Sequence, residues 1–151
     1  MQSNYIYICF FAILISLAYG KTVKYADCGS TKSVVSSVDI NPCDAEPCVL
    51  HKGTNVSVSI EFTPNEDVTA GKAVVHGIIM HVPAPFPLPD ADLCKFSSPT
   101  CPLKAGQKYV YKNNLEVKSI YPSLRLVVQW ELKDSNNNEL VCVKMPVSIS
   151  S

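Results

Sequence analysis

The feature that most constrains the fold is an alternation of apolar and polar residues along several short segments. In NVSVSIEF (55–62), every second residue from Val56 to Phe62 is apolar, and the residues between them are serine or glutamate. The same period of two occurs at 72–80, 123–132 and 139–149, and more weakly at 33–40, 108–112 and 115–120. Because successive side chains of a strand point to opposite faces, each segment is predicted to be a half-buried strand.

Turn-forming stretches separate these segments, and DSNNNE (134–139) is typical of a hairpin loop between two long strands. Helical periodicity is absent beyond about one turn. About seven short strands with such turns predict an all-β fold, an immunoglobulin-like antiparallel β-sandwich. The cysteines lie in predicted loops and near the ends, so the Cys…Trp…Cys core pattern of antibody domains is not expected.

Residues 1–20 are predicted to be a secretory signal peptide. Their apolar run from Ile6 to Leu17 is interrupted only by Ser16, and Ala18 and Gly20 are the small residues of a cleavage site. The segment before the run has no Lys or Arg, so an uncleaved anchor is the alternative, although a span needs ~20 residues. The remainder, 21–151, suits a single domain with one core.

Cysteine usage indicates a disulfide-linked domain. Cys9 lies in the signal peptide, and six of the seven cysteines remain, an even number in a secreted chain. Six cysteines allow 15 connectivities, but two short loops that contain proline favour local pairs. The predicted bridges are Cys43–Cys48, Cys94–Cys101 and, for the remaining pair, Cys28–Cys142. A zinc site is the competing interpretation, and the spacings match no standard zinc pattern.

Charge and motif content argue against several functions. Thirteen basic and 13 acidic residues give a net charge of zero, which does not favour nucleic acid as a partner. No serine or cysteine lies in a nucleophile motif, and no phosphate-binding glycine loop is present, so we expect neither an enzyme nor a cofactor. His76 and His81 would face opposite sides of a strand, so no metal site is expected. Asn55 opens the one glycosylation sequon, Asn-Val-Ser, and a glycan is predicted there.

The segment HVPAPFPLPD (81–90) has proline at every second position from Pro83 to Pro89. Prolines favour an extended backbone and remove four N–H donors. Such a segment can follow an apolar opening without leaving N–H groups unsatisfied. The spacing is expected to put Ala84, Phe86 and Leu88 on a common side.

Several motifs together resemble one family. They are DCGS (27–30), PC….PC (42–48), KAVVHGIIM.VPAPFPLP (72–89), YPS (121–123), LVVQWEL (126–132) and the late VCVKMPV. These motifs resemble the ML, or lipid-recognition, domain family, in particular its Niemann-Pick type C2 branch of secreted sterol carriers. The resemblance covers nearly all of 21–151, and we expect an arthropod member. It implies a sandwich whose sheets enclose a lipid cavity, with the same three bridges.

The resemblance also implies roles for individual residues. The mouth of the cavity would be formed by Phe86, Val117 and Tyr121. The lining would include Val75, Ile79, Leu115, Val128 and Trp130. Surface charges needed for efficient transfer would be Lys52, Asp92 and Lys95. A sterol would enter tail first and leave its hydroxyl near the mouth.

The chain departs from the sterol carriers at two places that shape the ligand. Val143 stands where vertebrate carriers usually have tryptophan, and Glu116 stands where they have proline beside the mouth. The resemblance therefore implies a secreted, monomeric carrier that holds a sterol or similar lipid and delivers it to a membrane surface or a membrane sterol transporter, with a lysosomal destination as the alternative. Alternative functions are a carrier of fatty acids or semiochemicals, a recogniser of microbial lipids, and a purely structural sandwich.

Overall fold

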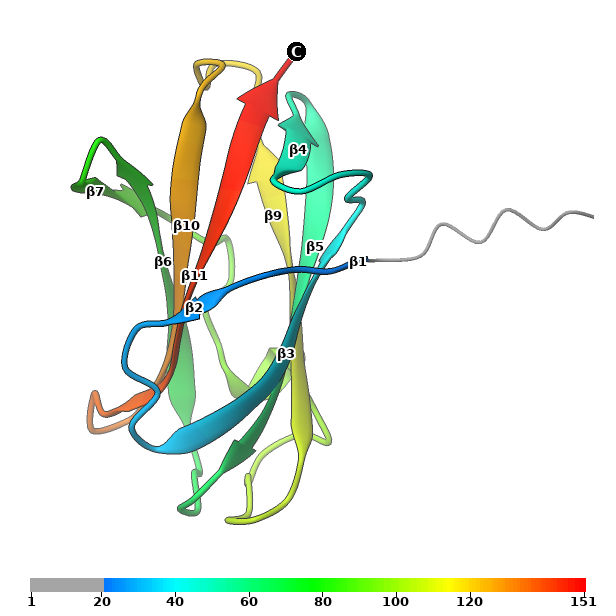
Figure 1. The fold of residues 1–151 in the computed structure, drawn as a ribbon. Helices are drawn as coiled ribbons and strands as arrows, with labels where there is room; N and C mark the ends of the chain where they lie inside the picture. The colour runs from blue at the N-terminus through cyan, green and yellow to red at the C-terminus, as the bar shows by residue number, and fades with distance from the viewer. Residues whose placement is uncertain (1–20) are drawn as a thin grey trace, which may run out of the picture.

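The computed structural model describes residues 21–151, and the predicted signal peptide lies outside the described residues. The chain forms two sheets that pack face to face, which confirms the predicted β-sandwich (Figure 1). One sheet has the spatial order β1 (Lys21–Thr22), β3 (Ser33–Asn41), β5 (Thr54–Pro64), β9 (Tyr109–Val117) and β8 (Ser97–Ser98). The other has the order β2 (Ala26–Asp27), β11 (Glu139–Ser150), β10 (Arg125–Asp134), β6 (Gly71–Ile79) and β7 (Val82–Phe86), and β4 (Cys48–His51) pairs in parallel with β11.

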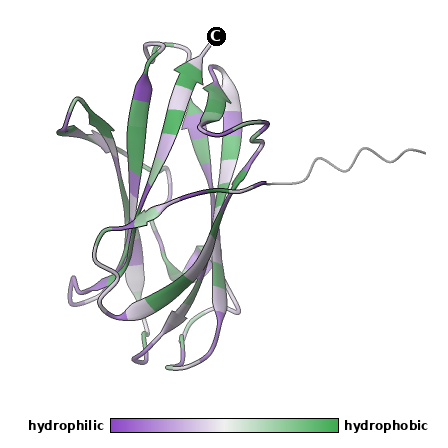
Figure 2. Ribbon diagram, in the orientation of Figure 1, coloured by the Kyte–Doolittle hydropathy of each residue, from purple (hydrophilic) through white to green (hydrophobic). Residues whose placement is uncertain are grey.

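The alternation seen in the sequence becomes the core between the two sheets. Hydrophobic and hydrophilic residues alternate along the long strands (Figure 2). In β5, the apolar residues Val56, Val58, Ile60 and Phe62 are all buried. In β10, Val128 and Trp130 are buried on the same inward face, which continues to Leu132. The predicted faces of these strands are therefore confirmed.

One strand was predicted as two. The segments 108–112 and 115–120 are a single strand, β9, which ends at Val117. The interruption in the sequence is Asn113, a polar residue on the inward face. Its Nδ2 donates to the Tyr111 hydroxyl at 3.0 Å and to the Asp90 carbonyl at 3.2 Å, so the buried amide is satisfied and the strand continues.

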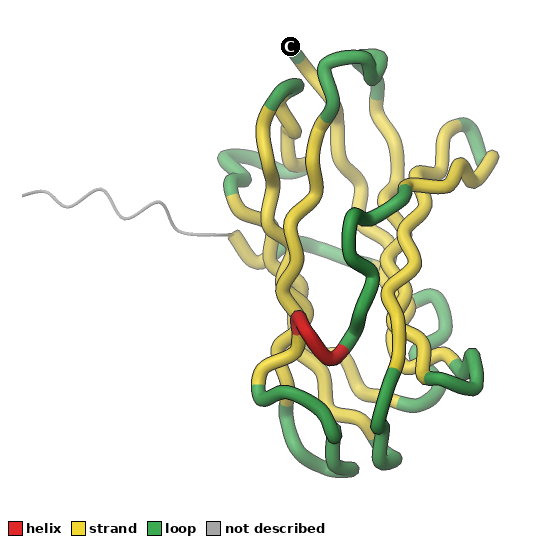
Figure 3. The backbone as a smooth tube through the Cα atoms, turned by 180° about the vertical axis from the view of Figure 1, so that it is seen from behind, coloured by secondary structure: helices red, strands yellow, loops and turns green. Residues whose placement is uncertain are grey.

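The proline-rich segment is more regular than the sequence predicts. Its first half is β7, an edge strand that pairs with β6 and sets Phe86 opposite Val75. Proline is tolerated at an edge because alternate N–H groups there face away from the sheet. The four prolines are exposed, while Ala84, Phe86 and Leu88 are half-buried, which confirms their common side. The chain then crosses to the other sheet and reaches a 3-10 turn at Cys94–Phe96 (Figure 3).

The three predicted disulfides are present. Cys28–Cys142 joins the N-terminal segment to β11, Cys43–Cys48 closes the loop before β4, and Cys94–Cys101 holds the 3-10 turn. Within residues 21–151, no group of three or more His, Cys, Asp or Glu side chains is placed to hold a metal ion. In the same range, no helix reaches the length and apolarity required to cross a membrane.

Candidate functional site

An apolar cavity lies between the sheets near the end of the sandwich where β9 meets the turn into β10. Its walls come from both sheets, from β7 and from the segment after β9. They are formed by Leu50, Val75, His76, Gly77, Phe86, Leu115, Val117, Tyr121, Leu126, Val128, Val147 and Ile149. Its volume is about 20 Å³, room for about one water molecule. The cavity is therefore too small for a lipid in this structure.

Two larger hollows lie immediately outside this cavity, and both share Phe86 and Tyr121 with it. The first, of about 180 Å³, is apolar and lies between β7 and the turn that contains Pro122 and Leu124. The second, of about 230 Å³, lies between β9 and Pro87–Pro89 and has polar residues in its wall. The rings of Phe86 and Tyr121 border all three spaces and pack edge to face with centroids 5.5 Å apart.

The mouth and lining residues expected from the resemblance lie mostly together. Phe86, Val117 and Tyr121 border the closed cavity, as do Val75, Leu115 and Val128. Ile79 instead borders the outer apolar hollow. Trp130 borders none of the three spaces. It is the next inward-facing residue of β10 after Val128, is fully buried, and packs against Tyr111 with ring centroids 5.9 Å apart.

Six further wall residues were not predicted, and two of them, His76 and Gly77, follow the predicted Val75 on β6. Leu126, Val147 and Ile149 lie on the inward faces that the alternation had already defined, so the signal was present and was not used. Leu50 belongs to the four-residue strand β4, which is too short to show a period. Its place in the wall follows from pairing with Ile149 of β11, a contact distant in sequence.

The three residues expected to serve transfer lie in two places. Lys52 is in the turn before β5, beside Gly53, whose N–H donates to the Val117 carbonyl at 2.6 Å. Asp92 and Lys95 lie at the 3-10 turn, where an Asp92 carboxylate oxygen accepts the Cys94 N–H at 2.8 Å. The Nζ of Lys95 is bound to Asp90 at 2.7 Å, which lowers the pKa of Asp90 and raises that of Lys95.

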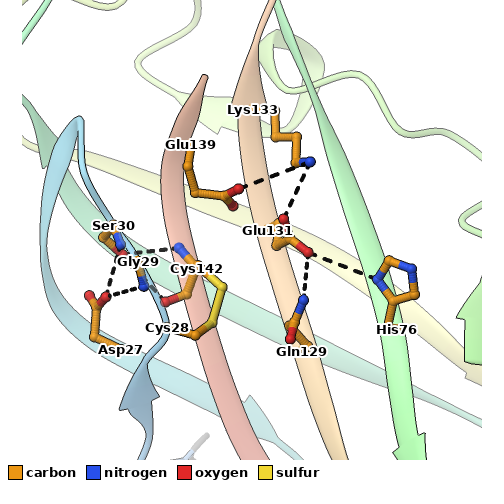
Figure 4. Close-up of a disulfide and its surroundings, with 10 residues drawn as sticks. All are labelled: Asp27, Cys28, Gly29, Ser30, His76, Gln129, Glu131, Lys133, Glu139 and Cys142. Carbon is orange, nitrogen blue, oxygen red and sulfur yellow. Dashed lines mark hydrogen bonds and ion pairs between the residues drawn. A yellow bond between two sulfur atoms is a disulfide. The ribbon is translucent and has the colours of Figure 1, made fainter. Parts of the chain in front are cut away.

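A cluster of titratable residues lies on the outer face of the second sheet (Figure 4). Lys133 Nζ is 3.5 Å from Glu131 and 4.0 Å from Glu139, and His76 Nδ1 is 3.9 Å from Glu131. Gln129 donates to Glu131 at 2.6 Å. Burial, a hydrogen bond with Glu131 and the charge of Glu131 raise the pKa of Glu139 to about 7.

The pKa values of the two carboxyl groups in this cluster shift in opposite directions. Burial by itself would raise the pKa of Glu131, but hydrogen bonds from Glu139 and Gln129 and the charge of Lys133 outweigh it and lower that pKa. Glu131 therefore ionises at a lower pH than Glu139. The ring of His76 faces this outer cluster (Figure 4).

The fold and the cavity define the class: a disulfide-linked β-sandwich with an apolar space between its sheets. The sequence profile of the ML domain family matches residues 22–149, and the chain belongs to this family.

Its relatives include sterol transporters. NPC intracellular cholesterol transporter 2 of the dog is 48% identical over 133 residues, covering 88% of this chain and 89% of that protein. The bovine protein of the same name is 43% identical over 141 residues, covering 93% and 94%. A crystal structure of a Niemann-Pick type C2 protein from the Japanese carpenter ant matches with a TM-score of 0.78 and 34% identity, covering 84% of this chain and 99% of that one.

Proposed function

We propose that this protein binds a sterol or a similar apolar lipid between its two sheets and transfers it to membranes or acceptor proteins. The observation that carries the proposal is an apolar cavity with two outer hollows beside it, and Phe86 and Tyr121 in the walls of all three. Pockets for small molecules typically measure ~300–1,000 Å³. The closed cavity is too small, but movement of these two rings would join the three spaces into one of that size.

Binding of this kind requires no chemical step. Its free energy comes from burial of apolar surface, at ~25 cal/mol per Å² before the costs of ordering. Val75, Leu115, Val117 and Val128 would contact the ligand from the two sheets. Trp130 and Tyr111 would form the floor below it. A fatty acid or another apolar lipid is the alternative ligand for the same walls.

The proposal is tested by the lipid content of the protein. Protein purified without detergent is extracted with organic solvent, the extract is analysed by mass spectrometry, and the delipidated protein is titrated with a fluorescent sterol and with oleate. Co-purified lipid or saturable uptake is expected. An empty extract with no uptake of either ligand would refute the proposal and favour a purely structural sandwich.

We further propose that the protein is secreted as a monomer. Three disulfides require an oxidising compartment, in agreement with the predicted signal peptide. Asn55 is exposed on β5, so a glycan attached there could project into solvent. Expression in insect cells should give a medium fraction that begins at Lys21 and shifts in mass with a glycosidase. Retention of residues 1–20 in the membrane fraction would favour the anchor.

A further inference from the structure

The longest of the strands that lie at an edge of either sheet is β7. Among the described strands, β1, β2 and β8 end the two sheet orders with two residues each, and β4, which pairs with β11, has four. β7 has five residues and pairs with β6 alone, so its other side is open along its whole length (Figure 1). An open strand of this kind is a template to which a strand of another molecule can add.

The uncovered parts of two longer strands are interrupted. β3 extends beyond β1, and a bulge between Val35 and Ser37 breaks its register with β5. β9 extends beyond β8, and its Asn114 N–H, on the side away from β5, is bound by the Asn113 side chain at 2.8 Å. Both features weaken strand addition. β7 has no such interruption, because its register with β6 is unbroken, and it has no charged residue, which is another common protection of sheet edges.

Proline occupies the backbone positions of β7 that face the open side. Pro83 and Pro85 flank Ala84, which pairs with Gly77 of β6. In an antiparallel pair, residues that exchange both backbone hydrogen bonds alternate with residues whose backbone groups face away. A proline has no N–H to exchange, so Ala84 and Gly77 are the bonded pair, and the backbone of both prolines faces outward. The open edge of β7 therefore has carbonyl acceptors but no N–H donor at these positions.

The side chains beside this edge are apolar and exposed, since Met80 is 89% exposed and Val82 is 65% exposed. A second copy of the chain could bury this surface by adding its own β7 antiparallel to the first about a two-fold axis. In the pairing centred on Ala84, Pro83 of each copy lies opposite Pro85 of the other. These two pairs would form four backbone hydrogen bonds. Each of the four bonds requires the N–H of a proline, so none of them forms.

We infer that Pro83 and Pro85 protect the open edge of β7 against strand addition by a second copy of this chain and so keep the protein monomeric. The inference rests on the proposed monomeric state and is independent of the proposed lipid. The chain thus retains a long edge strand, which places Phe86 in the wall of the cavity, without exposing a template for association.

The test is sedimentation velocity of the secreted protein without added lipid, at concentrations up to ~1 mM. The wild-type protein should remain monomeric. Pro83→Ala and Pro85→Ala each restore two of the four hydrogen bonds, and the double variant restores all four. The double variant should therefore dimerise about tenfold more tightly than either single variant. In the dimer, the restored amide groups at positions 83 and 85 should exchange slowly with solvent hydrogen, and their exchange should become faster on dilution.

Pro87→Ala combined with Pro89→Ala is the matched control, because these prolines lie in the crossover beyond β7 and would donate none of the four bonds. It should remain monomeric. If the double variant in β7 melts like the wild-type protein and is still monomeric at ~1 mM, or associates while both restored amides exchange rapidly, the inference is refuted. The single variants decide the question if the double variant does not fold. A wild-type dimer would overturn both the inference and the proposed monomeric state, whereas the proposed lipid binding is tested separately.

Discussion

Stability should fall as the pH rises from 5 to 7.5, and Glu139 should be the cause. Burial and the neighbouring carboxylate of Glu131 raise its pKa from 4.5 to about 7. A carboxyl group whose pKa is raised by folding stabilises the fold. The contribution is complete at a pH below the pKa of the group in the unfolded chain, and it is lost as the pH rises to the pKa of the group in the folded chain. The stabilising contribution of Glu139 is therefore lost between about pH 4.5 and about pH 7. Glu131, whose pKa is lowered, contributes in the opposite sense below that window.

The magnitude follows from the same interval. At ~1.36 kcal/mol per unit of pKa shift, the raised pKa of Glu139 can contribute at most ~3 kcal/mol to the free energy of unfolding. The side chain of Glu139 is 24% exposed and Lys133 lies 4.0 Å away, so solvent and the ammonium group reduce the effect. We expect a loss of ~1–2 kcal/mol in the free energy of unfolding between pH 5 and 7.5.

Urea unfolding at pH 5, 6, 7 and 7.5 measures this loss, with the variant Glu139→Gln in parallel. The amide cannot ionise, so the variant should lose at least half of the pH dependence of the free energy of unfolding. Subtracting the variant's values from those of the wild type at each pH removes the histidine contributions common to both proteins. Asp44→Asn, which changes an exposed carboxylate, should keep the wild-type slope. An unchanged slope in Glu139→Gln would show that another group carries the dependence.

Three further changes test the packing around the cavity. Phe86→Ala should speed release of a bound fluorescent sterol by about tenfold in stopped-flow measurements, because it removes the Phe86–Tyr121 ring contact, and an unchanged rate would place the exit elsewhere. Gly71→Ala should destabilise the fold by ~1–3 kcal/mol in urea, since a β-carbon there meets the Lys133 carbonyl and the Leu93 side chain, and a neutral result would mean that the strands shift freely. Asn113→Ala should cost ~1–3 kcal/mol, because it leaves the Tyr111 hydroxyl without its donor; equal stability would show that Asn113 is dispensable.

The alternation predicted the strands because a side-chain period of two is a property of a strand, whereas the cavity walls were expected from the family resemblance. Val128 could be placed on an inward face from its own segment, but Val75 could not, because both faces of 72–80 are largely apolar. The edge strand β7 could not be predicted, because its prolines contradict strand propensity and its pairing depends on β6 and the turn at Met80 and His81, where φ is 49° and 67°. The outer cluster was also missed, since Glu131 and Glu139 are brought together only by pairing of β10 with β11.

The small cavity is compatible with the proposed function because one wall of the site is held by fewer strand pairings than the other. The wall that must move consists of β7, which has one neighbouring strand, and Tyr121, which lies in a turn. Separating the two rings gives up ~0.5–1.5 kcal/mol of aromatic contact. A lipid that loses ~300 Å² of apolar surface gains ~7 kcal/mol at ~25 cal/mol per Å². The ligand can therefore open the mouth by its own burial, while β5 and β10 remain paired on both sides and keep the floor in place.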